Sequence, residues 1–270
     1  MTDTGLVPEG VEADRPSVAR LYDYFLGGHH NFAADRELAR RLLQAEPHAR
    51  YIVAENRAFL GRAVRFLLDA GIRQFLDLGS GIPTQENVHE IAQRGDPAAR
   101  VAYVDNDPVA VAHSRQILSD NLLATAIKAD LRQPDAVLSH PDVTALIDFS
   151  QPVGLLMVTV LHFVPDSDDP VGVVRRFASR LAPGSFLIIS HATDEAAPGA
   201  AAQVKDLYKS TTAAAHTRSG AEIMRFFDGF DMVEPGLVYL PLWRPDGGLP
   251  EHPERAWFYA GAGRKPAQAG

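Results

Sequence analysis

The segment Phe75-Leu76-Asp77-Leu78-Gly79-Ser80-Gly81-Ile82-Pro83-Thr84 joins a short apolar run to a turn of small residues. The run predicts a buried parallel β-strand over residues 74–78. Glycines at the carboxyl end of such a strand let the backbone pass close to a nucleoside-bearing ligand, because a side chain there would fill the space. The alternative is a tight strand-to-helix turn that needs glycine only for its positive φ. The residues that we expect at the ligand are Asp77, Gly79, Ser80 and Gly81.

Short apolar runs separated by helical segments continue on the carboxyl side of this turn. That pattern is typical of a parallel sheet covered by helices on both faces, and it predicts an α/β fold. Two late runs are joined by a long loop that contains proline and glycine. The further predicted strands cover residues 100–104, 125–128, 153–158, 185–190, 230–233 and 257–260, and the predicted helices cover residues 84–94, 108–118, 134–139 and 171–181.

On the amino side of the turn the pattern is helical throughout. Apolar residues recur at spacings of three and four, and Gly27-Gly28 and Pro47 mark breaks between three predicted helices over 16–25, 33–45 and 49–69. We therefore divide the chain into four parts. These are a flexible amino terminus (1–15), a helical cap (16–70), an α/β catalytic domain (71–260) and a flexible tail (261–270).

Asp105 follows the second predicted strand, 24 positions after Gly81. An acidic side chain at this position can accept hydrogen bonds from both hydroxyls of a ribose, and Asn106 lies beside it. The alternative is a loop carboxylate or a helix N-cap. Asp107 fits the N-cap role better because Pro108 follows it at the first helical position.

The third and fourth predicted strands end in further polar residues. Asp130 is placed to accept a hydrogen bond from the exocyclic amine of an adenine, and Leu131 offers an amide or an apolar edge to the ring; an exposed loop acid is the alternative. Thr159 and His162 follow the fourth strand, where a reacting group would lie. His162 is a candidate base, although a lone histidine in an apolar run is more often simply packed or hydrogen-bonded.

Composition excludes several classes of function. The chain has 270 residues, a formal net charge of −8 and no cysteine. Because phosphate binding uses clustered Lys and Arg, we expect no nucleic-acid partner and favour a small molecule. No apolar run approaches the roughly 20 residues of a membrane span and no signal core is present, so we expect no membrane association and a cytoplasmic protein. We predict no metal site: Asp166, Asp168 and Asp169 read as a solvated loop, and His29 and His30 are adjacent.

Together, these residues resemble the motifs of class I S-adenosylmethionine-dependent methyltransferases. Residues 77–81 look like the first motif, Asp105 like the ribose acid and Asp130-Leu131 like the adenine contact. A late strand pair at the end of the sheet also suits that fold better than a dinucleotide enzyme. Many members carry a third glycine where this chain has Pro83, so the turn here has a fixed φ and one fewer amide donor.

The amino-terminal residues 16–28 and 31–36 resemble the signature of an actinobacterial methyltransferase family once catalogued as a domain of unknown function. The resemblance covers nearly the whole chain. It implies a Rossmann-like seven-stranded class I methyltransferase sheet with an N-terminal helical cap, and S-adenosylmethionine as the cofactor. Within the cap we expect Tyr22, Gly28 and Asn31 to contact the cofactor; the alternative is that the cap tyrosines only pack against the sheet.

The predicted function is methyl transfer to an unidentified small-molecule acceptor. One alternative is a non-catalytic regulator that binds S-adenosylmethionine or S-adenosylhomocysteine, because no residue is unmistakably a general base. A nicotinamide-dependent oxidoreductase is a weaker alternative. Thr84 occupies the last position of the Gly-x-Gly-x-x-Gly pattern, and no Tyr-x-x-x-Lys follows it.

Overall fold

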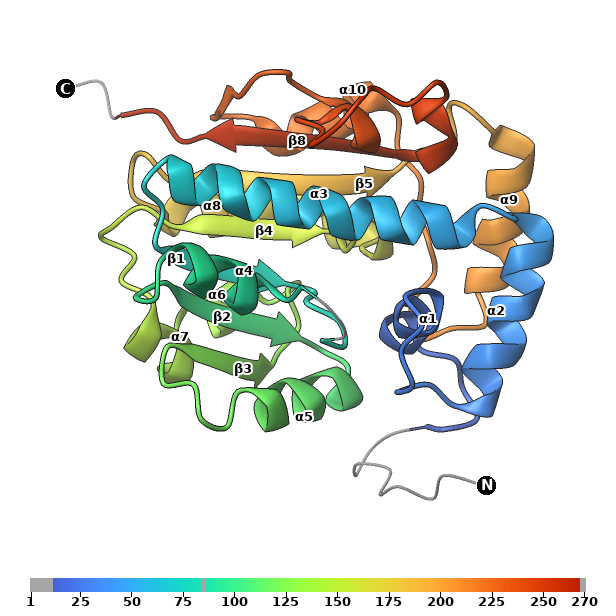
Figure 1. The fold of residues 1–270 in the computed structure, drawn as a ribbon, viewed down its shortest axis with the longest axis horizontal. Coiled ribbons are helices and arrows are strands. Elements are labelled where there is room, and N and C mark those ends of the chain that lie inside the picture. Colours follow the sequence, from blue (N-terminus) through green and yellow to red (C-terminus); the bar gives the residue numbers. More distant parts are fainter. Residues whose placement is uncertain (1–11, 84–85, 268–270) are drawn as a thin grey trace.

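A mixed eight-stranded β-sheet lies at the centre of the structure, a computed structural model that describes residues 12–83 and 86–267. The strand order is β3-β2-β1-β4-β5-β8-β6, and β7 also pairs with β8 (Figure 1). Strands β1 to β5 run parallel, whereas β8 runs antiparallel to its neighbours. The strands are β1 (Gln74–Leu78), β2 (Arg100–Asp105), β3 (Ala124–Lys128), β4 (Gly154–Val158), β5 (Phe186–Ala192), β6 (Asp231–Met232), β7 (Val238–Tyr239) and β8 (Phe258–Arg264).

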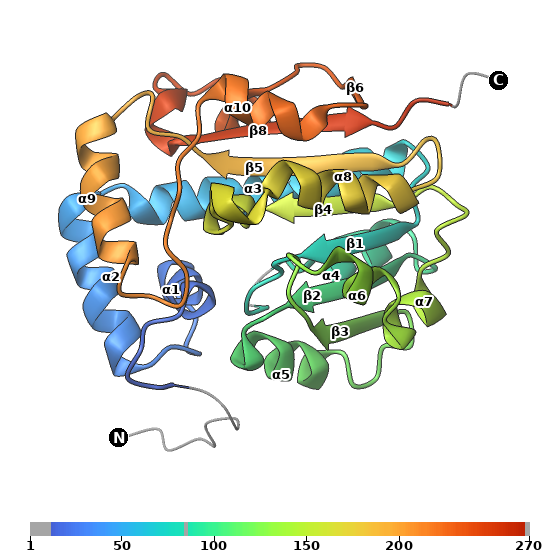
Figure 2. The same cartoon turned by 180° about the vertical axis from the view of Figure 1, so that it is seen from behind.

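Helices cover both faces of the sheet, which confirms the predicted α/β fold class. Alternate strand residues face opposite sides: Phe75 and Val101 pack in one core cluster with α3 and α4, and Leu76 and Ala102 pack in the other with α6, α7 and α8 (Figures 1 and 2). Burial on both faces explains why the strand sequences are almost continuously apolar. The helices are α3 (Ala49–Asp69), α4 (Val88–Gly95), α5 (Pro108–Ile117), α6 (Pro134–Leu138), α7 (Pro141–Leu146), α8 (Pro170–Arg180) and α10 (Gly220–Met224).

The order of the strands creates a crevice at the carboxyl ends of the central strands. From β1 the chain builds outward through β2 to β3 and then returns to β4, so β1 pairs with both β2 and β4. In open α/β sheets, ligands bind outside the carboxyl ends of the strands at such a reversal. The fold therefore places the turn after β1, the end of β2 and the end of β4 around one crevice.

A helical cap stands beyond the carboxyl ends of the parallel strands (Figure 1). It contains α1 (Val18–Phe25) and α2 (Ala33–Ala45), as predicted, together with α9 (Pro198–Tyr208) from the far part of the chain. Leu21, Phe25 and Leu42 form a small core, and Val204 and Tyr208 of α9 pack against it. The predicted division at residue 70 does not separate two bodies, because α3 runs from the cap into the sheet core, where Phe59 and Leu67 are fully buried.

Two predicted boundaries differ from the structure. The prediction of a flexible tail was wrong for residues 261–264, because β8 continues to Arg264. The glycines of this segment let the strand pack closely, since a Cβ at Gly263 would lie 2.8 Å from the Cβ of Phe230. Helix α4 begins at Val88 behind an Asn87–Glu90 capping box, and the predicted start at residue 84 lies outside the described residues. Within the part of the chain that the structure describes, no helix has the length and apolar character needed to cross a membrane.

Candidate active site

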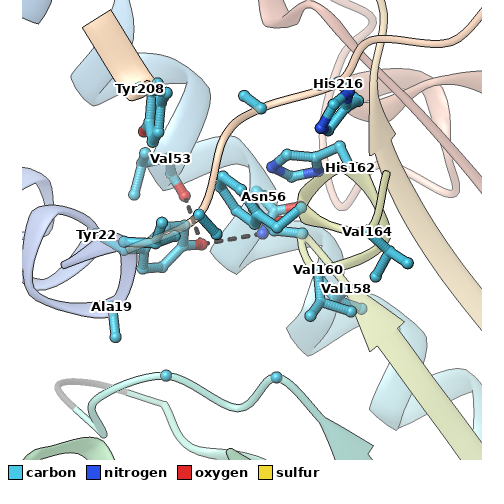
Figure 3. A pocket seen from close by; sticks show the side chains of 18 of the residues that line it. Ala19, Tyr22, Val53, Asn56, Val158, Val160, His162, Val164, Tyr208 and His216 are labelled. Atoms are coloured by element: carbon cyan, nitrogen blue, oxygen red, sulfur yellow. Dashed lines mark hydrogen bonds between the residues drawn. The ribbon is translucent and has the colours of Figure 1, made fainter. Parts of the chain in front are cut away.

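A cavity of about 480 Å³ lies between the cap and the carboxyl ends of the strands (Figure 3). We call its two sides the strand-end half and the cap half. The strand-end half is lined by Asp77 and by residues 79–81, 105–107 and 129–132. The cap half is lined by α1, α3, α9, the end of α2 and residues 212–217. Thr159 and His162 lie between them, after β4.

The glycine turn after β1 has two differently constrained positions. Gly79 and Gly81 both have positive φ, of 74° and 67°. A Cβ at Gly79 would lie 2.3 Å from Val160 Cγ2, whereas a Cβ at Gly81 would meet nothing within 4 Å. The backbone of Gly79 thus packs closely against the chain that follows β4, and the open space lies at Gly81, toward the cavity.

Asp107 is the N-cap of α5, as predicted, whereas the Asp105 side chain accepts hydrogen bonds from two main-chain amides. Asp105 Oδ2 accepts a 2.7 Å hydrogen bond from the Gly81 amide, and Oδ1 accepts one of 2.8 Å from the Asp107 amide. Asp107 caps α5 by accepting from the Val109 amide at 2.8 Å, and it also accepts from the Ser17 hydroxyl of the cap. Burial raises the pKa of Asp105 to about 6, although the amides of Asp107 and Gly81 oppose that shift.

Asp77 is a buried carboxylate in the strand-end half and is 6% exposed. None of the described residues, 12–83 and 86–267, donates a hydrogen bond to the Asp77 carboxyl. Burial raises its pKa to about 7; nearby Arg57 opposes this shift and Asp105 adds to it. Arg57, on α3, also lines the cavity; its Nε is buried without a partner among the described residues, and its guanidinium lies 5.7 Å from the Tyr22 ring centroid.

The end of β3 holds two ion pairs made by one arginine, which the sequence alone did not indicate. Arg132 donates to Asp130 Oδ2 at 2.6 Å and to Asp168 at 2.9 Å. Partial burial would raise the pKa of Asp130, but the hydrogen bonds from Arg132 hold it below its usual value. Asp130 and Leu131 both line the cavity.

A chain of hydrogen bonds joins the cap to the ends of β4 and β5, and Figure 3 shows its first link, between Tyr22 and Asn56. Tyr22 accepts from Asn56 Nδ2 at 2.9 Å, Asn56 Oδ1 accepts from the Ser190 hydroxyl at 2.6 Å, and Ser190 Oγ accepts from the Thr159 amide at 3.0 Å. Thr159 has a φ of 58°, an unusual value for a β-branched residue. Tyr22 and Thr159 were predicted as site residues, whereas Asn56 was not.

His162 projects into the cavity near His216 (Figure 3) and is 4% exposed. Its Nδ1 is buried without a hydrogen-bond partner in the described part of the chain. Burial, together with nearby His191 and the positive charge of Arg218, lowers the pKa of His162 well below the usual value, so the imidazole is neutral at pH 7. That shift weakens it as a base and suits a neutral hydrogen-bonding role instead.

Arg218 holds the segment that carries His162. It donates to the Leu161 carbonyl at 3.1 Å and to the Val164 carbonyl at 2.9 Å, on either side of His162. It also lies 2.8 Å from His191 Nε2. We did not expect a role for this residue, because it lies 56 positions from His162 in the chain.

Gly28 and Asn31 are not part of the cavity lining. Asn31 Nδ2 donates to Asp23 and to the Gly28 carbonyl, each at 2.9 Å, and the Gly28 amide donates to the Asp23 carbonyl at 2.8 Å. A Cβ at Gly28 would lie 2.0 Å from Asp23 Oδ1. The structure therefore places both residues in the turn that follows α1, and only Tyr22 of the three predicted cap residues lines the cavity.

Solved structures with this fold include methyltransferases. A Thermobifida fusca protein described as a candidate methyltransferase is 41% identical, with a TM-score of 0.91 over 97% of this chain and 100% of the other. A DUF574 family protein from Streptomyces avermitilis is 37% identical, with a TM-score of 0.90 over 94% and 100%. Human N-acetylserotonin methyltransferase with S-adenosylmethionine is 15% identical and shares the fold, with a TM-score of 0.51 over 94% and 64%. No curated protein matches the sequence.

The sheet order, the glycine turn and the strand-end acids define a class I methyltransferase that uses S-adenosylmethionine. The family model described as S-adenosyl methyltransferase matches residues 5–266, and the chain belongs to that family. The resemblance of the amino-terminal signature is confirmed.

Proposed function

We propose that the protein transfers a methyl group from S-adenosylmethionine to a small, largely apolar acceptor bound under the cap. The observation that carries this proposal is the continuity of one cavity from the strand-end acids to the apolar cap helices. A donor in the strand-end half and an acceptor in the cap half would meet beside Thr159 and His162. Such a reaction depends mainly on holding the two molecules in contact and excluding water.

The strand-end half offers a partner for each part of the donor. Each Asp105 oxygen has a second lone pair for a ribose hydroxyl, and Asn106 lies next to it. Asp130 and Leu131 are placed for the adenine. Gly81 leaves open space where the chain must pass close to the ligand. The remaining residues that we assign to the donor are Asp77, Gly79, Ser80 and Thr159.

The amino acid end of the donor matches two groups whose side chains form no hydrogen bond with any residue that the structure describes. Asp77 is a buried carboxylate suited to an ammonium group, and the Arg57 guanidinium is suited to a carboxylate. Leaving a buried polar atom such as Arg57 Nε unpaired costs about 1–3 kcal/mol, so the carboxylate of a zwitterionic ligand would relieve that cost. The Asp77 carboxylate also opposes the doubly negative pyrophosphate of a nicotinamide dinucleotide, which argues against the oxidoreductase alternative.

The cap half is suited to an apolar acceptor. Its walls include Phe25, Ile52, Val53 and Val204. Its lysine is already engaged, since Lys205 Nζ donates to Asp194 at 2.9 Å and to Thr217 at 3.0 Å. The neutral imidazole of His162 provides a hydrogen-bonding group for orienting the acceptor.

S-Adenosylmethionine, when bound, supplies a methyl group already activated by the positive sulfur. The protein's own residues then have three tasks. Asp77, Arg57 and Asp105 hold the donor, the cap excludes water, and His162 orients the acceptor's nucleophilic atom. The hydrogen-bond chain from Tyr22 to Thr159 keeps the cap in register with the strand ends.

Isothermal titration calorimetry tests the donor assignment. The purified protein is titrated in parallel with S-adenosylmethionine, S-adenosylhomocysteine and NAD⁺. We expect micromolar binding of the first two and none of NAD⁺. If neither S-adenosylmethionine nor S-adenosylhomocysteine binds, the proposal is wrong, and binding of NAD⁺ alone would favour the oxidoreductase.

A further inference from the structure

Asp77 occupies an unusual position for a carboxylate. It lies within β1, paired in register with Tyr103 of β2 and Leu156 of β4, at the centre of the sheet. Its side chain is 6% exposed and lines the cavity. Neither oxygen has a hydrogen-bond donor in the described ranges 12–83 and 86–267, in contrast to Asp105, whose two oxygens each accept from an amide.

The charges around Asp77 do not balance. Arg57 on α3 is the cation that faces it, Asp105 at the end of β2 is a second carboxylate, and Tyr103 contributes a phenol. Leu156 on the β4 side is apolar. The buried carboxyl of Asp77 therefore has one cation and a second carboxyl close to it. The arrangement favours one proton on the pair unless another positive charge enters the cavity.

The methyl donor and its product differ by one positive charge. S-Adenosylmethionine carries a sulfonium, an ammonium and a carboxylate, whereas S-adenosylhomocysteine has lost the sulfonium charge. The two molecules share the ribose, the adenine and the zwitterionic end. Both bring the ammonium group that we assign to Asp77, so a difference in the response of Asp77 to the two molecules comes from the sulfonium, whose charge adds to that of the ammonium.

Building on the proposed function, we propose that Asp77 releases a proton when the donor binds and retains more of it with the product, so that the cavity selects the charged donor. On donor binding, the carboxylic acid becomes a carboxylate and one proton enters solvent. When the methyl group moves, the electron pair of the carbon–sulfur bond stays on sulfur and the positive charge disappears. Asp77 then takes a proton from solvent, and the acceptor's own proton remains the single net proton of the reaction.

The direction of the pH effect follows from this exchange. Because the pKa of Asp77 is about 7 in the free protein, donor binding below that pH must displace a proton, and the affinity for the donor falls as the pH falls. The limit is about tenfold per pH unit for one proton. Above about pH 8 the carboxylate is already ionised and the dependence ends. Asp105 has a pKa of about 6, so its protonation lowers ligand affinity only at lower pH. It lowers the affinity for both ligands equally, because both carry the ribose.

Calorimetry in two buffers measures how many protons the protein releases when a ligand binds. Each ligand is titrated near pH 7 in phosphate and in Tris, whose ionisation enthalpies differ, and the change in observed enthalpy gives the number of protons released. A group with a pKa of about 7 is half protonated there, so we expect release of about half a proton with S-adenosylmethionine and clearly less with S-adenosylhomocysteine. Between about pH 6 and 8, the preference for the donor should rise about three- to tenfold.

Two variants assign the proton to its residue. Asp77→Asn resembles the protonated acid and should abolish both the difference in proton release and the pH dependence of the preference. Asp130→Asn is the matched control. Asp130 also lines the cavity, but its pKa is held low by Arg132, so this variant should leave proton release near pH 7 unchanged.

Equal proton release for the two ligands would overturn the inference, as would a difference that persists in Asp77→Asn. If that variant does not fold, the wild-type comparison in two buffers still decides. Absence of binding by both ligands in every buffer is a different result, because it removes the donor assignment itself.

Discussion

The two halves of the cavity are built in different ways. In the strand-end half, short consecutive stretches provide the polar groups, and main-chain amides hold the key side chain: Asp105 accepts from Gly81 and Asp107. In the cap half, single residues from distant helices meet, and side chains such as Asn56 hold one another in place. A backbone-built site is common to many proteins of one fold, whereas a site of gathered side chains can change with the acceptor. Substitutions should therefore have larger effects in the strand-end half.

The largest effect is expected at Gly79. Gly79→Ala would place a Cβ at positive φ and 2.3 Å from Val160 Cγ2, so the free energy of unfolding should fall by about 3 kcal/mol. Gly81→Ala is the matched control, because its φ is similar and its Cβ would meet nothing within 4 Å; about 1 kcal/mol is expected there. Urea denaturation of both variants measures the difference. Equal losses would show that close packing against Val160 is unimportant.

Asp105→Ala should weaken donor binding without unfolding the protein. It removes the charged acceptor of the ribose hydroxyls, and the expected loss of about 2 kcal/mol corresponds to about a 30-fold rise in Kd. Calorimetry with S-adenosylmethionine measures the change, and circular dichroism confirms folding. An unchanged Kd in a folded variant would refute the ribose assignment.

Tyr22→Phe tests the connection between the halves. The variant keeps the ring but removes the hydroxyl that accepts from Asn56 at 2.9 Å, so it should lower the free energy of unfolding by about 1 kcal/mol. Hydrogen exchange should increase in α1 more than in β1. If exchange increases equally in both, the hydroxyl does not specifically hold the cap.

His162→Gln should have the smallest effect on the donor. Glutamine keeps a neutral hydrogen-bonding group, and the Kd for S-adenosylmethionine should change by less than about threefold. Calorimetry is again the measurement, with the melting temperature as the control for folding. A tenfold or greater change would move His162 from the acceptor side to the donor side of the cavity.

Much of the fold was predictable because its signals are local. The strand over 74–78 was predicted with its observed bounds, and Pro108 correctly indicated Asp107 as a helix N-cap. Helices α2 and α3 were likewise predicted over their observed ranges. The expectation failed for the tail, where glycines that look like loop residues are strand residues packed beneath Phe227 and Phe230.

The sequence by itself determined the sheet, the glycine turn and the strand-end acids, since hydrophobic period, glycine and proline act over a few neighbouring residues. Only the tertiary structure decided that Arg57 and Asn56 reach the cavity, that α9 completes the cap and that Gly28 and Asn31 do not line the site. It also decided the charge states of Asp77 and His162, since a pKa depends on burial and on charges brought close by folding, which the order of residues does not reveal.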